Sequence, residues 1–297
     1  MDTPETDKAQ FVAVDFDPFA GSELSGTAPS TEGQREIWAA AQMGEDASAA
    51  FNESVSLRFV GDLDVAAFEG AVQDLVARHE ALRTTFSPDG LTLCIAASQE
   101  IAVAQEDLRG AEERDRAFRV RTVLAEEVQR PFSLEYGPLF RVRLLRLGER
   151  EHLATFTAHH IVCDGWSMAV MLNDLGALYT ARRQGKAAEL PEAPRFSAYA
   201  RAEREFERSE EYAAAERYWV ERLSGSLPSL DLPLDAARPP SKTYSSRRED
   251  YALGPELVTR LKKAGAKQGA SFFTVLLSAF STLLARLSGE SELVVGI

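Results

Sequence analysis

The sequence predicts a mixed α/β (α+β) fold arranged as two lobes. Segments that alternate like β-strands and segments with the helical period of about 3.6 residues follow one another in mixed order. Residues 181–195, which contain glycine and two prolines, interrupt this pattern and mark the expected linker between the lobes. The chain has 297 residues, of which 45% are hydrophobic, and about 150 residues suffice for a domain. We expect an acidic, linker-like leader over 1–29, a first lobe over 30–180 and a partial second lobe over 196–297.

Capping residues and periodicity place the elements of the first lobe. Thr31 can cap a helix that runs to Ala41, and Gln34 stands at the reciprocal position of a capping box. Asp64 caps a second amphipathic helix. The other predicted elements are a strand at 54–59, a hairpin of 82–86 and 91–96, a helix at 112–129, a hairpin of 140–147 and 152–160, and a helix from Ser167.

Beyond the linker the predicted elements are mainly helical. A charged segment at 197–223 predicts one long helix, and a proline-rich crossing follows at 227–240. Pro255 and Ser271 open two further helices. Short strands are predicted near 250–253 and from 292 to 297.

The composition excludes several classes of function. Lys and Arg number 33 against 46 Asp and Glu, and the net charge of −13 opposes binding to nucleic acid. No apolar run reaches the ~18 residues that span a membrane, and the first residues do not resemble a secretory signal. The two cysteines, Cys94 and Cys163, are far apart, which indicates a reducing, cytoplasmic environment. No metal-ligand or nucleotide-binding spacing occurs, so we expect neither a metal nor a nucleotide cofactor.

One short segment concentrates the remaining chemistry. His159 and His160 end a predicted strand, where neighbouring side chains alternate faces, so we expect them to point in opposite directions and not to share a metal. Asp164 and Gly165 then form a good turn before a helix whose N-terminal amides point back at that turn. A strand end, a histidine and a helix N-terminus together can stabilise an oxyanion.

The same spacing has a structural interpretation. A buried pair of strand histidines beside an Asp that caps a helix would give this pattern, and spacing alone favours it. We expect Cys163 to be a packed turn residue rather than a nucleophile. His152 is expected to be exposed, and His79 to lie at a helix C-terminus, where the dipole favours a cation. A longer match that includes Trp166 and Ser167 makes coincidence less credible.

Several motifs in series resemble one enzyme family. Ala158-His-His-Ile-Val-Cys-Asp-Gly-Trp-Ser167 resembles the His-His-x-x-x-Asp-Gly motif of nonribosomal peptide synthetase condensation domains, and Arg78-His-Glu-Ala-Leu-Arg-Thr-Thr-Phe86 resembles a second motif at every defined position. Thr31-Glu-Gly-Gln-Arg-Glu-Ile-Trp38 is similar to the family's first motif, although Gly33 and Glu36 replace the usual Ala and Arg. The resemblance also includes 131–141 and Tyr218-Trp219, and it extends in order from Thr31 to Ile297.

This resemblance implies a fold, a reaction and a set of site residues. The fold would be similar to chloramphenicol acetyltransferase, with two such lobes. The reaction would join a donor acyl or peptidyl thioester to an acceptor amine, in nonribosomal peptide or hybrid polyketide biosynthesis. The implied catalytic set is His160, Asp164, Gly165 and His159, with His160 acting on the substrate. Residues implied to support the site are Arg78, Arg83, Trp166 and Ser167.

The implied partners carry the only cofactor. Phosphopantetheine would belong to the donor and acceptor carrier proteins, so this chain needs no bound cofactor or metal, and neighbouring synthetase domains are the other expected partners. Neutral His160 could take a proton from the attacking amine or only hold the amine by a hydrogen bond, and both roles stay open. We expect Asp164 to form a buried ion pair with Arg78 or Arg83, whose loss would cost ~3–5 kcal/mol.

Other functions are weighed against this one. Epimerization domains would place Ser before Trp, and heterocyclization domains would replace the first histidine by Asp, whereas this chain has Trp166 before Ser167 and retains His159. A coenzyme A-dependent acyltransferase and a non-catalytic carrier-protein-binding module remain alternatives. Because the second lobe continues beyond this point in the resembled family, we expect the chain to be C-terminally incomplete and to have little activity alone.

Overall fold

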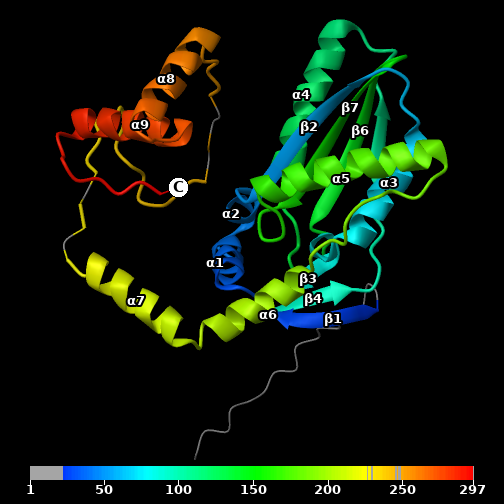
Figure 1. Ribbon diagram of the computed structural model, residues 1–297. Coiled ribbons are helices and arrows are strands. Elements are labelled where there is room, and N and C mark those ends of the chain that lie inside the picture. The colour runs from blue at the N-terminus through cyan, green and yellow to red at the C-terminus, as the bar shows by residue number, and fades with distance from the viewer. Residues whose placement is uncertain (1–22, 226, 229, 245, 247–248, 297) are drawn as a thin grey trace, which may run out of the picture. The chain divides into compact units, whose positions relative to one another are not determined.

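The computed structural model describes residues 23–225, 227–228, 230–244, 246 and 249–296 (Figure 1). Its internal contacts divide the chain into two compact units, Met1–Glu207 and Arg208–Ile297. The division follows Glu207 rather than the predicted linker at 181–195, because α6 (Phe196–Phe206) packs against β1 (Leu24–Pro29) in the first unit.

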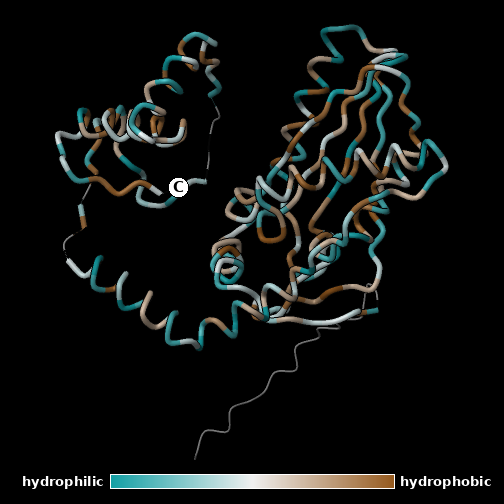
Figure 2. The backbone as a smooth tube through the Cα atoms, in the orientation of Figure 1, coloured by the Kyte–Doolittle hydropathy of each residue, from teal (hydrophilic) through white to brown (hydrophobic). Residues whose placement is uncertain are grey.

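The first unit is built around a four-stranded sheet with the order β2-β7-β6-β5. The bounds of its strands are β2 (Asn52–Val60), β5 (Val103–Asp107), β6 (Phe140–Gly148) and β7 (Glu151–His159). The neighbours β2–β7 and β7–β6 are antiparallel, and β6–β5 is parallel. Figure 2 shows apolar segments, coloured brown, within this sheet.

Helices cover both faces of this sheet. The helices α3 (Val65–Arg78) and α5 (Gly165–Gln184) pack on each other and on one face, where Phe140, Val142 and Phe156 join their core. The helix α4 (Glu113–Gln129) covers the opposite face through Val123, which packs with Leu145. Alternate residues of β6 therefore belong to different cores, as the pleat of a strand requires.

A smaller sheet lies beside the main one, with the order β1-β4-β3. It comprises β1, β3 (Thr84–Phe86) and β4 (Thr92–Ala96), and three short helical segments complete the unit: α1 (Glu32–Ala41), α2 (Glu45–Ala49) and the 3-10 helix η1 (Glu80–Arg83). The predicted leader is wrong over 24–29, because β1 gains an antiparallel partner in β4 that its own composition does not reveal. Residues 1–22 of that leader lie outside the described residues.

Local signals predict most elements of this unit correctly. Thr31 and Gln34 form the expected capping box of α1, and the Asp64 carboxylate accepts from the Ala67 amide at the start of α3. The predicted hairpins and the helix at 112–129 are also confirmed. The prediction that His152 is exposed is wrong, because its side chain is buried on β7, and this burial lowers its pKa.

The described part of the second unit is helical. It contains α7 (Glu210–Leu223), α8 (Pro255–Lys267) and α9 (Phe272–Ser288). The single helix predicted at 197–223 is wrong, because α6 ends at Phe206 and the Ser209 hydroxyl caps a separate α7. The strands predicted at 250–253 and 292–297 do not form over their described residues, since no neighbouring strand in the described part of this unit supplies hydrogen bonds.

Among the described residues, no single helix is long and apolar enough to cross a membrane. The consecutive pair α8 and α9 meets that criterion only when combined, by length and composition, and it bends by 98° at the break.

Candidate functional site

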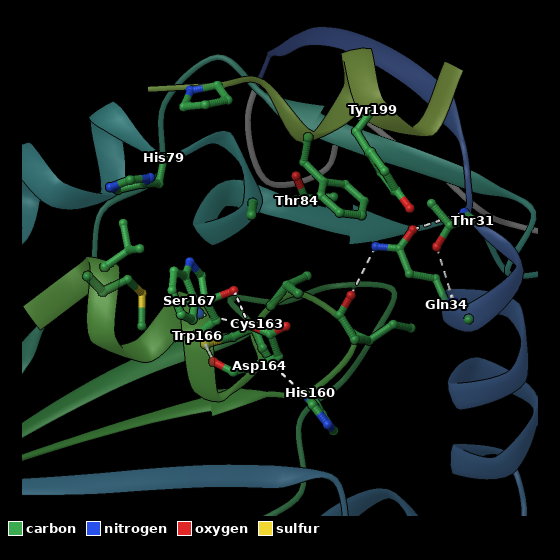
Figure 3. A pocket seen from close by; sticks show the side chains of 18 of the residues that line it. Thr31, Gln34, His79, Thr84, His160, Cys163, Asp164, Trp166, Ser167 and Tyr199 are labelled. Atoms are coloured by element: carbon green, nitrogen blue, oxygen red, sulfur yellow. Dashed lines mark hydrogen bonds between the residues drawn. The ribbon is translucent and has the colours of Figure 1, made fainter. Parts of the chain in front are cut away.

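A cavity of about 560 Å³ lies in the first unit where the end of β7 and the start of α5 meet α1, η1 and α6 (Figure 3). His160, Asp164 and Trp166 line it from the predicted motif. Gln34 and Tyr199 line it from α1 and α6. The sequence did not predict the contribution of α6, because it assigned that segment to the other lobe.

His160 stands on the turn that follows β7. Its main-chain N–H donates to the Phe51 carbonyl at 2.8 Å, and its Nδ1 lies 2.7 Å from the Cys163 carbonyl oxygen. A carbonyl can only accept, so Nδ1 carries a proton and, in the neutral ring, Nε2 is the free basic atom. The side chain is 40% exposed at the edge of the cavity, and Figure 3 shows the ring turned away from Tyr199. His160 is thus an accessible imidazole with a defined tautomer.

A carboxylate that sequence reasoning missed lies beside His160. Glu53 Oε1 is 3.7 Å from His160 Nδ1, and its side chain is 32% exposed. Glu53 reaches this position because β2 pairs with β7 and places it opposite Ala158. That register is a long-range property of the sheet, so the sequence near the motif carries no signal for it.

His159 points into the core instead. It is fully buried, its ring lies 5.9 Å from that of Phe51 and 6.2 Å from that of Phe132, and its Nδ1 accepts from the Ile161 amide at 3.2 Å. Burial, with the nearby charge of His160, lowers the pKa of His159 to about 4, so this ring is neutral near pH 7. The two rings diverge as predicted. His159 does not line the cavity, which makes it part of the framework rather than of the implied catalytic set.

Asp164 is the N-cap of α5. Its Oδ1 accepts from the Ser167 amide at 2.7 Å and from the Ser167 hydroxyl at 2.6 Å. These two bonds lower the pKa of Asp164, and its carboxylate is exposed rather than buried. The capping interpretation of the motif is therefore correct for Asp164.

The predicted ion pair between Asp164 and Arg78 or Arg83 is wrong. Arg78 Nε instead donates to Asp174 Oδ2 at 2.8 Å, because Asp174 lies on the part of α5 that packs against α3. Arg83 donates to the Ala96 carbonyl, which joins η1 to β4.

The motif from Arg78 to Phe86 connects the helices and strands that surround the site. His79 Nε2 shares Asp174 Oδ2 with Arg78, at 2.8 Å, at the C-terminal end of α3. The buried Glu80 carboxylate accepts from the Ser197 amide at the start of α6. The motif thus joins α3, α5, α6 and β4, and its two arginines bind neighbouring elements rather than line the cavity.

Of the remaining motif residues, Cys163, Trp166 and Ser167 line the cavity, whereas Gly165 does not. Gly165 is the first residue of α5, and a Cβ there would meet no atom within 4 Å, so its side is open. Trp166 is 82% exposed. Burial raises the pKa of Cys163 to about 12, which confirms a packed thiol rather than a nucleophile. Among the described residues, no group of three or more His, Cys, Asp or Glu could hold a metal.

Comparisons with known proteins find similar sequences over most of the chain. A family model described as "Condensation domain" matches residues 24–297. A linear gramicidin synthase polypeptide of Brevibacillus parabrevis is 37% identical over 271 residues, which are 90% of this chain and 5% of that protein. Phosphinothricin tripeptide synthetase PhsC of Streptomyces viridochromogenes is 37% identical over 274 residues, which are 91% of this chain and 25% of the synthetase.

Solved structures show the same fold. The first condensation domain of the CDA synthetase matches with a TM-score of 0.76 and 23% identity, over 90% of this chain and 63% of that one. The X-domain from teicoplanin biosynthesis matches with a TM-score of 0.71 and 33% identity, over 87% of this chain and 57% of that one. The chain thus spans less than two thirds of these domains and a small part of the synthetases. With the predicted α/β fold confirmed, the chain belongs to the condensation-domain family of nonribosomal peptide synthetases.

Proposed function

We propose that this chain supplies the histidine-bearing lobe of a condensation domain that forms amide bonds between carrier-bound substrates. The observation that carries the proposal is His160, whose Nδ1 is engaged by the Cys163 carbonyl at 2.7 Å at the edge of a cavity. A ring held in this way presents Nε2 as a hydrogen-bond acceptor for an amine. The reducing cytoplasm is the proposed location, in keeping with the free cysteines Cys94 and Cys163.

The proposed reaction transfers an acyl group from sulfur to nitrogen. The neutral amine of the acceptor attacks the carbonyl carbon of the donor thioester, and a C–N bond forms as the carbonyl oxygen gains negative charge. His160 Nε2 accepts the proton that the amine must lose. The oxyanion then collapses, the C–S bond breaks, and the donor phosphopantetheine leaves as a thiol after taking that proton. No oxidant, metal or additional reactant is required.

The cavity suits an acceptor or donor arm. Its volume of about 560 Å³ lies within the range of ~300–1,000 Å³ that is typical of small-molecule sites. The Asp164 carboxylate accepts from the Ser167 amide at the N-terminus of α5, so the positive end of this helix is engaged by Asp164 and is not assigned to the oxyanion. Donor and acceptor carrier proteins are the proposed partners, because they bring the phosphopantetheine thioesters.

A second candidate is a docking module without turnover. It is favoured by one observation: the teicoplanin X-domain, at 33% identity, is more similar in sequence than the CDA condensation domain at 23%, and a solved structure holds that X-domain in complex with OxyB. Under this alternative, the chain would bind a partner protein and leave the thioesters intact. The intact His160 site favours the catalytic proposal.

Intact-protein mass spectrometry tests the proposal. A donor carrier loaded with an acyl thioester and an acceptor carrier loaded with an aminoacyl thioester are mixed with the chain, and the acyl mass is expected to move to the acceptor arm. Because the chain spans 63% of the CDA domain, we propose that it turns over slowly alone. The assay therefore also uses a longer synthetase polypeptide that includes it. Carrier binding without mass transfer in both preparations would favour the docking module.

A further inference from the structure

Side chains bind both main-chain polar groups of Ile161, the residue that follows His160. The Ile161 amide donates to His159 Nδ1 at 3.2 Å, and the Ile161 carbonyl accepts from Gln34 Nε2 at 2.9 Å (Figure 3). Ile161 is only 3% exposed and Gln34 only 6%. These bonds are therefore shielded from water, and the loss of one partner would leave a buried polar group unsatisfied.

The orientation of the Gln34 amide is determined by its two neighbours. Its Oε1 faces the Thr31 amide at 3.1 Å, which can only donate, and its Nε2 faces the Ile161 carbonyl, which can only accept. The first bond belongs to the capping box of α1. The second has no part in capping, because Glu would serve the cap equally well at this position. The amide nitrogen of Gln34 therefore serves the turn rather than the helix.

We propose that Gln34 is a positioning residue for His160. Its bond to Ile161 fixes the turn in which Val162 N–H returns to the His159 carbonyl at 3.0 Å and the Cys163 carbonyl meets His160 Nδ1. Gln34 thus couples the N-terminus of α1 to the tautomer and orientation of the imidazole. This inference rests on the proposed function for its catalytic meaning, while its structural content can be measured without turnover.

The test removes the side-chain N–H of residue 34 and keeps its side-chain oxygen. Gln34→Glu retains a side-chain oxygen for the Thr31 amide but removes the N–H that binds Ile161. Thr31→Val is the matched control. It removes the hydroxyl that accepts from the main-chain N–H of Gln34 and leaves the bond from the Gln34 side chain to Ile161 intact. Each variant removes one hydrogen bond near the N-terminus of α1: Gln34→Glu removes the bond to the Ile161 carbonyl, and Thr31→Val removes a bond of the capping box. Only Gln34→Glu should disturb the turn.

Two readouts report on the turn directly. The chain has four histidines, so 15N-histidine spectra at about pH 8, above the reference imidazole pKa near 6.5, can separate their tautomers. In the unsubstituted chain and in Thr31→Val, His160 should be an Nδ1–H tautomer. In Gln34→Glu, an Nε2–H population should appear. Hydrogen exchange of the Ile161 amide should accelerate about tenfold, because the turn that holds this amide loses the stability of one buried hydrogen bond, the one to the Ile161 carbonyl.

The results separate positioning from capping. Unchanged His160 tautomer and Ile161 exchange in Gln34→Glu would overturn the inference, as would equal changes in Thr31→Val. If the buried carboxylate prevents folding, Gln34→Met, which is similar in volume, is measured in its place against the same control. A chain that shows the expected spectra but no acyl transfer would retain the coupling and refute the proposed function instead.

Discussion

Replacement of Asp164 by alanine distinguishes a helix cap from a buried ion pair. The structure shows Asp164 Oδ1 bound to the amide and hydroxyl of Ser167, with the carboxylate exposed at the start of α5. Asp164→Ala removes the cap and the favourable charge at the helix N-terminus. Asp164→Asn removes the charge and keeps an oxygen that can cap, because Asn and Asp are about equally good N-caps.

The expected magnitudes follow from these two contributions. Loss of an N-cap costs about 1 kcal/mol, and loss of the charge–dipole interaction at an exposed helix end costs about 0.3–1 kcal/mol. Asp164→Ala should therefore lower the free energy of unfolding by about 1–2 kcal/mol, and Asp164→Asn by about 0.5 kcal/mol. The pKa of Asp164 is lowered in the folded state, so its charged contribution is present at pH 7 and is lost as the pH falls through that folded pKa.

Urea unfolding followed by circular dichroism measures both variants. At pH 7 the alanine variant should lose more stability than the asparagine variant, and the loss of each variant relative to the unsubstituted protein should shrink in acid. A loss of ~3 kcal/mol or more in both variants would indicate a buried ion pair and refute the capping account. Equal stability of all three proteins would refute it as well.

Three further predictions concern the frame of the site. Because the folded pKa of His159 is about 4 and its unfolded value about 6.5, stability should fall as the pH is lowered between these values, by up to about 3 kcal/mol, and His159→Asn should flatten that slope in urea titrations. Asp174→Ala leaves two basic partners without their carboxylate and should cost up to ~3 kcal/mol, measured by urea unfolding, whereas a loss within error would mean that the pair is not structural. Gly90→Ala places a Cβ 2.4 Å from the Trp38 ring at a φ of +71° and should cost more than ~1 kcal/mol of stability. Gly33→Ala in α1 meets no atom within 4 Å and should raise the melting temperature. The reverse order of the two melting temperatures would contradict the packing.

The sequence predicts those features that depend on nearby residues. Thr31 and Gln34 complete a capping box within one helical turn, and the divergence of His159 and His160 follows from strand alternation. These interactions involve residues a few positions apart, so a local pattern contains all the information they need.

Long-range pairing accounts for what the sequence did not predict. The strand β1 has a Gly- and Pro-containing sequence of low β-propensity, and it forms because β4 provides its hydrogen bonds. Glu53 approaches His160 only through the β2–β7 register. The choice of Asp174 over Asp164 as the partner of Arg78 depends on which turn of α5 faces α3, and the spacing of the two acids does not reveal it.

The central claim is that His160 takes part in acyl transfer between two carriers. The most direct measurement is the single-turnover rate of amide formation, followed by mass spectrometry of the acceptor arm, for His160→Ala and the unsubstituted protein in the longer synthetase polypeptide. Our account predicts a rate reduced by ~10²–10⁴-fold, with circular dichroism and carrier binding unchanged, since the ring is 40% exposed and contributes little to the core. A rate for His160→Ala equal to that of the unsubstituted protein would contradict the account.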